Sequence, residues 1–382
     1  MSPTTPAGPA PRAANTSVIH DIGYKPYTGP RLGRRQIVRA LYVHSLRSVF
    51  GLGRGVKAKI MPFFVLAAVL IPAALNVYMS SASKSLVLPY GHMAYSLMLF
   101  SVLFAAAAAP EIVSRDLRHH TLPLYFSRPL RRIDYPLAKM LALFSGLAIV
   151  GVLPVLVSYV GQVASATSGH EIWADSKAAF PGLFAALAQA ALFSVISLLI
   201  ASTTGRRVIA TGVIAIFFLV SIAISGVLTS VVGRSWQEHT ASCVVPAFAP
   251  GSPRDTGDGN VFGFGGGENG PPTALFTQLC PGIDPDADNV GNIDGSLVQG
   301  RPGFANITVQ YQTPVYSTMA RVGGLTSPSR LVEGTRIWVF RAGDGEIPNP
   351  APLGPVYAAE LLVLVLAAGN GLFLRYRKVS VS

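Results

Sequence analysis

Charged residues are scarce in this sequence of 382 residues: Asp, Glu, Lys and Arg together make up only 13% of it. Soluble domains carry about 25%, so much of the charge that would keep a folded domain in solution is missing. Half of the residues are hydrophobic, and the mean hydropathy is +0.46. These values exclude an ordinary soluble protein and predict a polytopic membrane protein.

Cysteine is also scarce, with Cys243 and Cys280 as the only two. This number excludes a disulfide scaffold and any metal cluster with several cysteine ligands. Both cysteines fall in one long polar segment, and on an oxidising side of a membrane we expect them to form a disulfide. Two free thiols are the alternative.

Motifs for catalysis are absent as well. The sequence has no Gly-x-x-x-x-Gly-Lys-Ser/Thr loop, so the chain does not hydrolyse nucleotides by that route. It also lacks the His-Glu-x-x-His and Gly-x-Ser-x-Gly patterns of zinc peptidases and serine hydrolases. We therefore expect this chain not to be an enzyme and to bind no cofactor itself.

One acidic residue, Glu360, falls well inside an apolar stretch. A carboxylate inside a membrane is by default a candidate functional site, because placing a charge there is costly. If the chain were a membrane-embedded enzyme, Glu360 would be its candidate catalytic acid. No paired nucleophile or base is in view for that purpose. If the helix around Glu360 begins later than its hydropathy indicates, the carboxylate lies at the outer interface instead.

Six apolar stretches are long enough to cross a bilayer as helices, since about 20 helical residues span about 30 Å of hydrocarbon. None shows the period-two alternation of a strand. They are residues 60–80, 92–110, 137–160, 180–202, 208–232 and 353–374. The predicted fold is therefore an all-α polytopic membrane protein with six transmembrane helices.

The basic residues predict the topology of these helices. Twenty-one Lys and Arg lie on the side that both termini share, against Lys84 and Lys177 in the short loops opposite. The positive-inside rule then predicts that the N- and C-termini are cytoplasmic. Because these basic residues flank membrane helices, we expect the lipid bilayer as a partner and no nucleic acid.

The segments outside the helices differ in character. Residues 1–30 predict a disordered cytoplasmic tail. Residues 31–59 predict a basic amphipathic helix on the membrane surface, or alternatively a plain soluble helix. Its basic residues are Arg34, Arg35, Arg39 and Arg47. Residues 60–232 hold the first five membrane helices with a cytoplasmic loop at 111–136, and 353–382 hold the sixth helix and a cytoplasmic tail.

Residues 233–352 form a long extracytoplasmic loop that is rich in Gly and Pro. Apolar residues alternate from Ile307 to Tyr311, which predicts a strand, and we expect a second short strand over Arg336–Phe340. The loop also contains a series of acidic residues that could converge on calcium, although the Gly and Glu of a calcium loop are missing and turns use the same residues. This weak candidate site consists of Asp284, Asp286, Asp288 and Asp294.

The loop at 111–136 resembles that of the ABC-2-type transporter permeases. The resemblance rests on Glu111, Arg115-Asp116, Thr121-Leu122, Ser127-Arg128-Pro129, and Tyr135 with Lys139. The stretch 24–29 and the amphipathic helix are similar to a bacterial branch of that family. In all, the resemblance covers about residues 20–230 and the last span.

This resemblance implies a six-span permease subunit of a dimeric bacterial ABC exporter, homo- or heterodimeric, in the cell membrane. Glu111–Leu124 would form a coupling helix against a separate ATPase subunit, which binds the ATP and Mg²⁺, and Arg34–Phe50 would be the connecting helix. Two departures stand out. His120 occupies a position where the family often has Gly, and residues 233–352 replace a short pair of re-entrant helices.

A function of another class is also compatible with the sequence. The chain could be a membrane assembly or anchoring protein whose extracytoplasmic loop binds a cell-surface partner. The two hypotheses differ in which segment is essential: the loop at 111–136 for an exporter, the segment 233–352 for an anchor.

Overall fold

The computed structural model describes residue 29 and residues 33–83, 88–118, 130–246, 289–297, 304–341, 350 and 352–379. The chain divides into two compact units, Met1–Gly33 and Arg34–Ser382, and the helices and strands below belong to the second. Several predictions concern residues outside this description. These are the tail 1–30 apart from residue 29, and Thr121, Leu122, Cys280, Asp284, Asp286 and Asp288.

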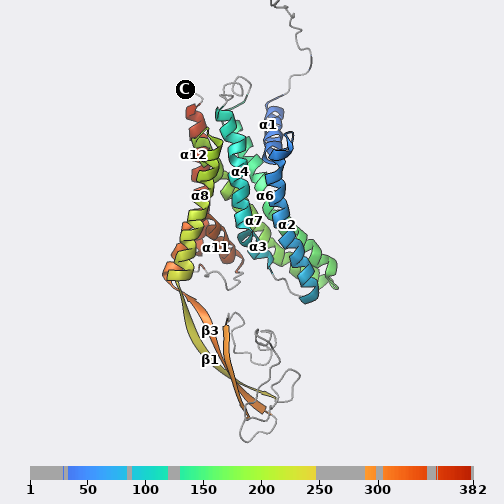
Figure 1. Ribbon diagram of the computed structural model, residues 1–382, viewed down its shortest axis with the longest axis vertical. Helices are drawn as coiled ribbons and strands as arrows, with labels where there is room; N and C mark the ends of the chain where they lie inside the picture. The colour runs from blue at the N-terminus through green and yellow to red at the C-terminus, as the bar shows by residue number, and fades with distance from the viewer. Residues whose placement is uncertain are drawn as a thin grey trace, which may run out of the picture. The chain divides into compact units, whose positions relative to one another are not determined.

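Five helices are long and apolar enough to cross a membrane. They are α2 (Val56–Ser83), α6 (Asp134–Ser165), α7 (Gly169–Thr203), α8 (Arg207–Gly226) and α12 (Gly354–Val379). Figure 1 shows them running side by side. The prediction of a helical, polytopic membrane protein is confirmed.

The stretch predicted as the second span is a bent pair of helices. Helix α3 (Tyr90–Ser96) and helix α4 (Met98–Arg118) meet at an angle of 49° around Leu97. Together they pass the same test of length and hydropathy, so the number of spans is five, or six if the pair counts as one. Helix α4 extends beyond its apolar part and carries Glu111 and Asp116 in its last two turns.

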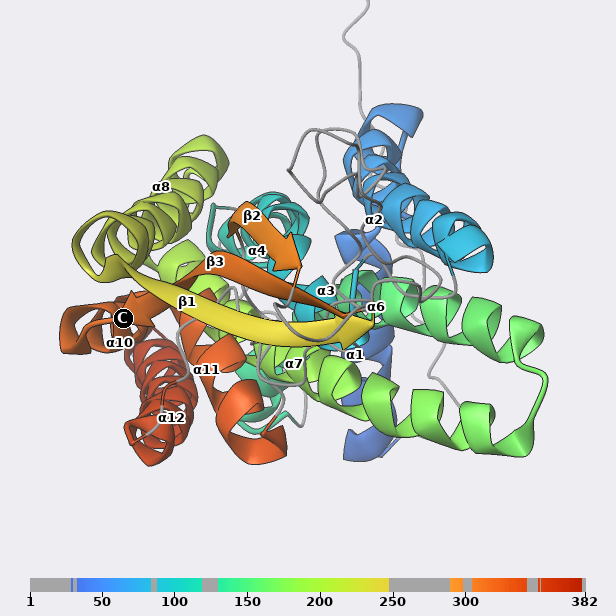
Figure 2. The ribbon, with the colours of Figure 1, turned by 90° about the horizontal axis from the view of Figure 1, so that it is seen from below.

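Helix α7 forms the centre of the bundle, since it packs against α3, α4, α6, α11 and α12. Small residues permit this close packing: Ala185, Ala186 and Ala190 are buried on α7, and Gly151 on α6 faces Ala186. Small interfacial residues are the usual way for membrane helices to approach one another closely. Figure 2 shows α7 running between α6 and the group formed by α11 and α12.

Helix α1 (Arg34–Val49) lies within the segment 31–59, and the end of that segment, from Val56, belongs to α2. Its buried residues Leu41, Ser45 and Val49 recur every fourth position and pack towards α6 and α4. Arg35, Arg39 and Arg47 are exposed on the rest of its surface.

A three-stranded antiparallel sheet follows α8 and its terminal π-helical turn η1 (Val227–Val232). The strands are β1 (Arg234–Pro246), β2 (Asn289–Leu297) and β3 (Phe304–Tyr316), in the order β1-β3-β2. β1 and β3 pair along their full length, from Arg234 opposite Tyr316 to Pro246 opposite Phe304. The strand predicted at 307–311 is confirmed.

The strand predicted over Arg336–Phe340 is wrong, because these residues are helical. After β3 the chain forms α10 (Thr318–Gly323), the 3₁₀ turn η2 (Gly324–Thr326) and α11 (Pro328–Phe340). Helix α11 packs against α3, α7, α8 and α12, and its residues Leu331, Val332 and Thr335 are buried. Burial at helical spacing overrides the strand preference of the Ile-Trp-Val-Phe run.

Candidate functional site

Basic and acidic side chains form ion pairs and hydrogen bonds between α1, α4, α6, α7 and α12 at one end of the bundle, which we call the charged end. Figure 1 shows α1 and the last turns of α4 and α12 at this end. Glu111 of α4 is its first centre. The carboxylate forms ion pairs with Arg54, in the turn between α1 and α2, and with Arg207 of α8, whose guanidinium lies 2.6 Å away. Only 10% of the Glu111 side chain is exposed. Glu111 therefore joins three segments that are distant in the sequence.

Asp116 is the second centre of the charged end. Its carboxylate accepts a hydrogen bond of 2.7 Å from the Tyr135 hydroxyl and lies 2.9 Å from the Lys139 ammonium group. Lys139 is buried, and the Tyr135 ring packs edge-on against Tyr376 of α12 at 5.1 Å. The pairing of Asp116 thus fastens the end of α4 to the start of α6, which in turn contacts α12.

Asp134 connects α1 to the same region. The Arg34 guanidinium donates two hydrogen bonds to it, of 2.7 and 2.6 Å, and the backbone N–H of Arg131 donates a third of 2.9 Å. The hydrogen bonds to Asp134 raise the pKa of the exposed Arg34 guanidinium. Such bidentate pairs have a defined geometry as well as a favourable energy.

The end of α7 is held by α12. The Arg375 guanidinium donates to the carbonyl oxygens of Ser202 at 2.5 Å and Thr203 at 3.2 Å. These carbonyls belong to the last turn of α7, which has no further helical N–H to satisfy them. At the charged end, side chains therefore connect α1, α4, α6, α7, α8 and α12.

The structure describes the side chains of only two of the predicted coupling residues, Glu111 and Asp116. Glu111 and Asp116 lie on α4 and use their carboxylates within the chain. Arg115 also lies on α4, and its side chain is outside the described part. The sequence did not reveal that Arg54 and Arg207 would meet Glu111, because they come from segments more than 50 residues to either side.

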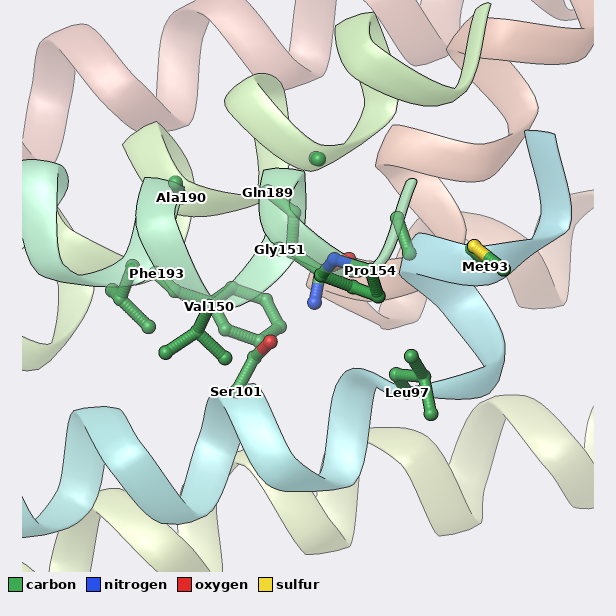
Figure 3. A pocket seen from close by; sticks show the side chains of 12 residues that line it. Met93, Leu97, Ser101, Val150, Gly151, Pro154, Gln189, Ala190 and Phe193 are labelled. Atoms are coloured by element: carbon green, nitrogen blue, oxygen red, sulfur yellow. The ribbon is translucent and has the colours of Figure 1, made fainter. Parts of the chain in front are cut away.

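A small cavity lies deeper in the bundle, between α3–α4, α6 and α7 (Figure 3). Its volume is about 10 Å³, which is room for one water molecule. Ser101 and Gln189 contribute polar groups to it, and Met93, Leu97 and Val150 contribute apolar ones. A cavity of this size does not hold a substrate.

A buried ion pair on α11 was missed by the sequence analysis. Arg336 donates to Glu333 through Nε at 3.1 Å and Nη2 at 2.6 Å, and the Nδ1 atom of His92 on α3 lies 3.5 Å from Glu333. Glu333 and Arg336 are each 1% exposed. Charges three residues apart would have been the signal for a helix, had residues 336–340 not been assigned to a strand.

Three further predicted residues, Glu360, Cys243 and Asp294, lie in regular helices or strands. Glu360 lies half-buried in the second turn of α12. Cys243 lies in β1 and Asp294 in β2, and their predicted partners are outside the described residues. Within the described ranges, no group of three His, Cys, Asp or Glu side chains could hold a metal ion.

The helices and their apolar surfaces define the class of this molecule: it is a membrane-embedded helical protein. No protein-family model and no curated protein matches its sequence. The charged end of the bundle is the best developed candidate site in the described residues.

Proposed function

We propose that this chain is the transmembrane permease subunit of an ABC exporter, which moves its substrate with ATP hydrolysed by a separate ATPase subunit. The observation that carries the proposal is the end of α4, where Glu111 and Asp116 connect it to α6 and α8. This segment is the one that resembles the ATPase-coupling segment of ABC-2-type permeases. In that reading ATP and Mg²⁺ bind to the ATPase subunit alone.

Two short helices between α8 and α12 are compatible with the proposal. ABC-2-type permeases usually have a short pair of re-entrant helices between the fifth and sixth spans, and α10 and α11 lie in that part of this chain. Helix α11 has 13 residues, about 20 Å in length, so it is too short to cross a membrane. The sheet β1-β3-β2 is then an insertion between α8 and this pair.

The proposed topology has six spans, with α3 and α4 counted as one, and both termini in the cytoplasm. The charged end then faces the cytoplasm and the sheet lies outside the cell membrane. This arrangement follows the positive-inside rule. It also turns the end of α4 towards the compartment that contains ATP.

The ion pairs suggest how a movement would be transmitted. If two states of the ATPase bind the end of α4 differently, ATP binding shifts the permease between two conformations. Asp116 passes the displacement to α6, and Glu111 passes it to α8 and to the turn before α2. We place the substrate path between two permease subunits, as the resemblance to a dimeric exporter implies.

Co-purification tests this function directly. The full chain is expressed with the genes that neighbour it, isolated in mild detergent and assayed for bound ATPase and ATP hydrolysis. We expect a P-loop ATPase to elute with the chain. Elution of the chain alone under several mild conditions would contradict the exporter assignment.

The second candidate is a membrane anchor whose extracytoplasmic segment binds a cell-surface partner. The long, fully paired strands β1 and β3 favour it, since a sheet of this kind can present a binding surface. A comparison of two variants distinguishes an anchor from an exporter. Removal of residues 234–316 abolishes the function of an anchor, whereas changes at Asp116 leave it intact.

A further inference from the structure

A hollow opens at the charged end, beside the ion pairs of Glu111. It is lined by Arg54 before α2, by Pro110, Glu111, Ser114 and Arg118 of α4, and by Gly205 and Arg207 at the start of α8. Its volume is about 290 Å³. This is room for a chemical group far larger than one water molecule.

The charge of this hollow is unbalanced. Three guanidinium groups line it, and Glu111 supplies the one carboxylate among its lining residues. Arg54 and Arg207 both pair with Glu111, whereas Arg118 is exposed and forms no ion pair with any residue that the structure describes. The lining thus carries two positive charges in excess, which attracts an anion.

An apolar hollow adjoins the polar one. The two share Arg54, Glu111 and Arg207, and the second, of about 40 Å³, continues along Met61, Pro62, Phe104, Ala107 and Ala108. These residues belong to the apolar parts of α2 and α4. A ligand that filled both hollows would be anionic at one end and apolar at the other.

We propose that this pair of hollows binds the phosphate group of an anionic glycerophospholipid. The phosphate lies among Arg54, Arg118 and Arg207, whose planar guanidinium groups suit bidentate contact with phosphate oxygens. The glycerol and the first carbons of an acyl chain lie against Met61 and Phe104. Basic pockets between membrane helices on the cytoplasmic side are a common form of lipid headgroup site.

Glu111 has a defined part in this site. Its carboxylate pairs with both Arg54 and Arg207, and Arg118 adds a third guanidinium to the lining of the hollow. Lipid binding at this site needs no ATPase subunit, so its test is independent of the test of the proposed function.

Native mass spectrometry of the purified full chain, with phosphatidylglycerol and phosphatidylcholine added in equal amounts, tests the proposal. Arg118→Gln is the main variant because it breaks no ion pair of the described residues, and Arg207→Gln is the second. Arg206→Gln is the matched control: Arg206 neighbours Arg207 and is exposed, but it does not line the hollow.

We expect phosphatidylglycerol to be retained in preference to phosphatidylcholine. Arg118→Gln and Arg207→Gln should each weaken its retention about fivefold, the effect of one basic residue near an anionic headgroup, while Arg206→Gln leaves it unchanged. Inorganic phosphate in excess should not displace the lipid. Equal losses in all three variants, equal retention of both lipids, or displacement by inorganic phosphate would each overturn the proposal.

Discussion

Arg336→Gln should destabilise the protein by about 3–5 kcal/mol, the usual cost of removing one partner from a buried ion pair. Glu333 is 1% exposed and receives two hydrogen bonds from Arg336, of 2.6 and 3.1 Å. Without the guanidinium, the buried Glu333 carboxyl group loses both of these hydrogen-bond donors. Because α11 packs against α3, α7, α8 and α12, a disturbed α11 should also weaken the packing of these four helices.

Thermal unfolding of the purified variants in detergent measures this effect. Arg341→Gln is the control, since Arg341 ends the same helix but is exposed. The double variant Glu333→Leu/Arg336→Leu should be more stable than Arg336→Gln, because it leaves no buried charge behind. A melting temperature of Arg336→Gln equal to that of Arg341→Gln would show that the ion pair does not stabilise α11.

Under the proposed function, Asp116→Arg should uncouple the chain from its ATPase subunit. The new guanidinium replaces the carboxylate that now lies 2.9 Å from the buried Lys139, and two like charges there force α4 away from α6. We expect the stimulation of ATP hydrolysis by the permease to fall about tenfold, which corresponds to about 1.4 kcal/mol. The rate is measured for the co-purified complex in nanodiscs and compared with that of the ATPase alone.

Two further variants make this result specific. Lys177→Glu reverses an exposed charge on α7 far from the charged end and should keep full stimulation. The exchange Asp116→Lys/Lys139→Asp restores opposite charges between α4 and α6 and should recover part of the stimulation. If Asp116→Arg behaves like Lys177→Glu, the end of α4 has no part in coupling.

The sequence predicted the elements whose signal is local. Long apolar runs gave α2, α6, α7, α8 and α12, and the alternation around Val309 gave β3. The bend near Leu97 was not predictable, because the packing of α3 against α7 and α11 decides it. Helix α11 was mistaken for a strand because its Ile-Trp-Val-Phe run favours extended structure when its neighbours are unknown.

The same distinction holds for the candidate site. The acidic residues Glu111 and Asp116 stand out from their sequence context, yet their partners Arg54, Arg207 and Lys139 are set by the arrangement of four helices. Glu333 and Arg336 are three residues apart, which brings two side chains together only if the segment is a helix. Because residues 336–340 were predicted as a strand, this ion pair was not predicted.

Photo-crosslinking in intact cells tests the central claim, that an ATPase subunit docks at the charged end. Ile133 is 59% exposed beside the first turn of α6, and Met319 is 63% exposed on α10 at the opposite end. A photoreactive amino acid at position 133 should crosslink to a P-loop ATPase, and one at position 319 should not. Crosslinks to an ATPase from position 319, or to none from position 133, would contradict the account.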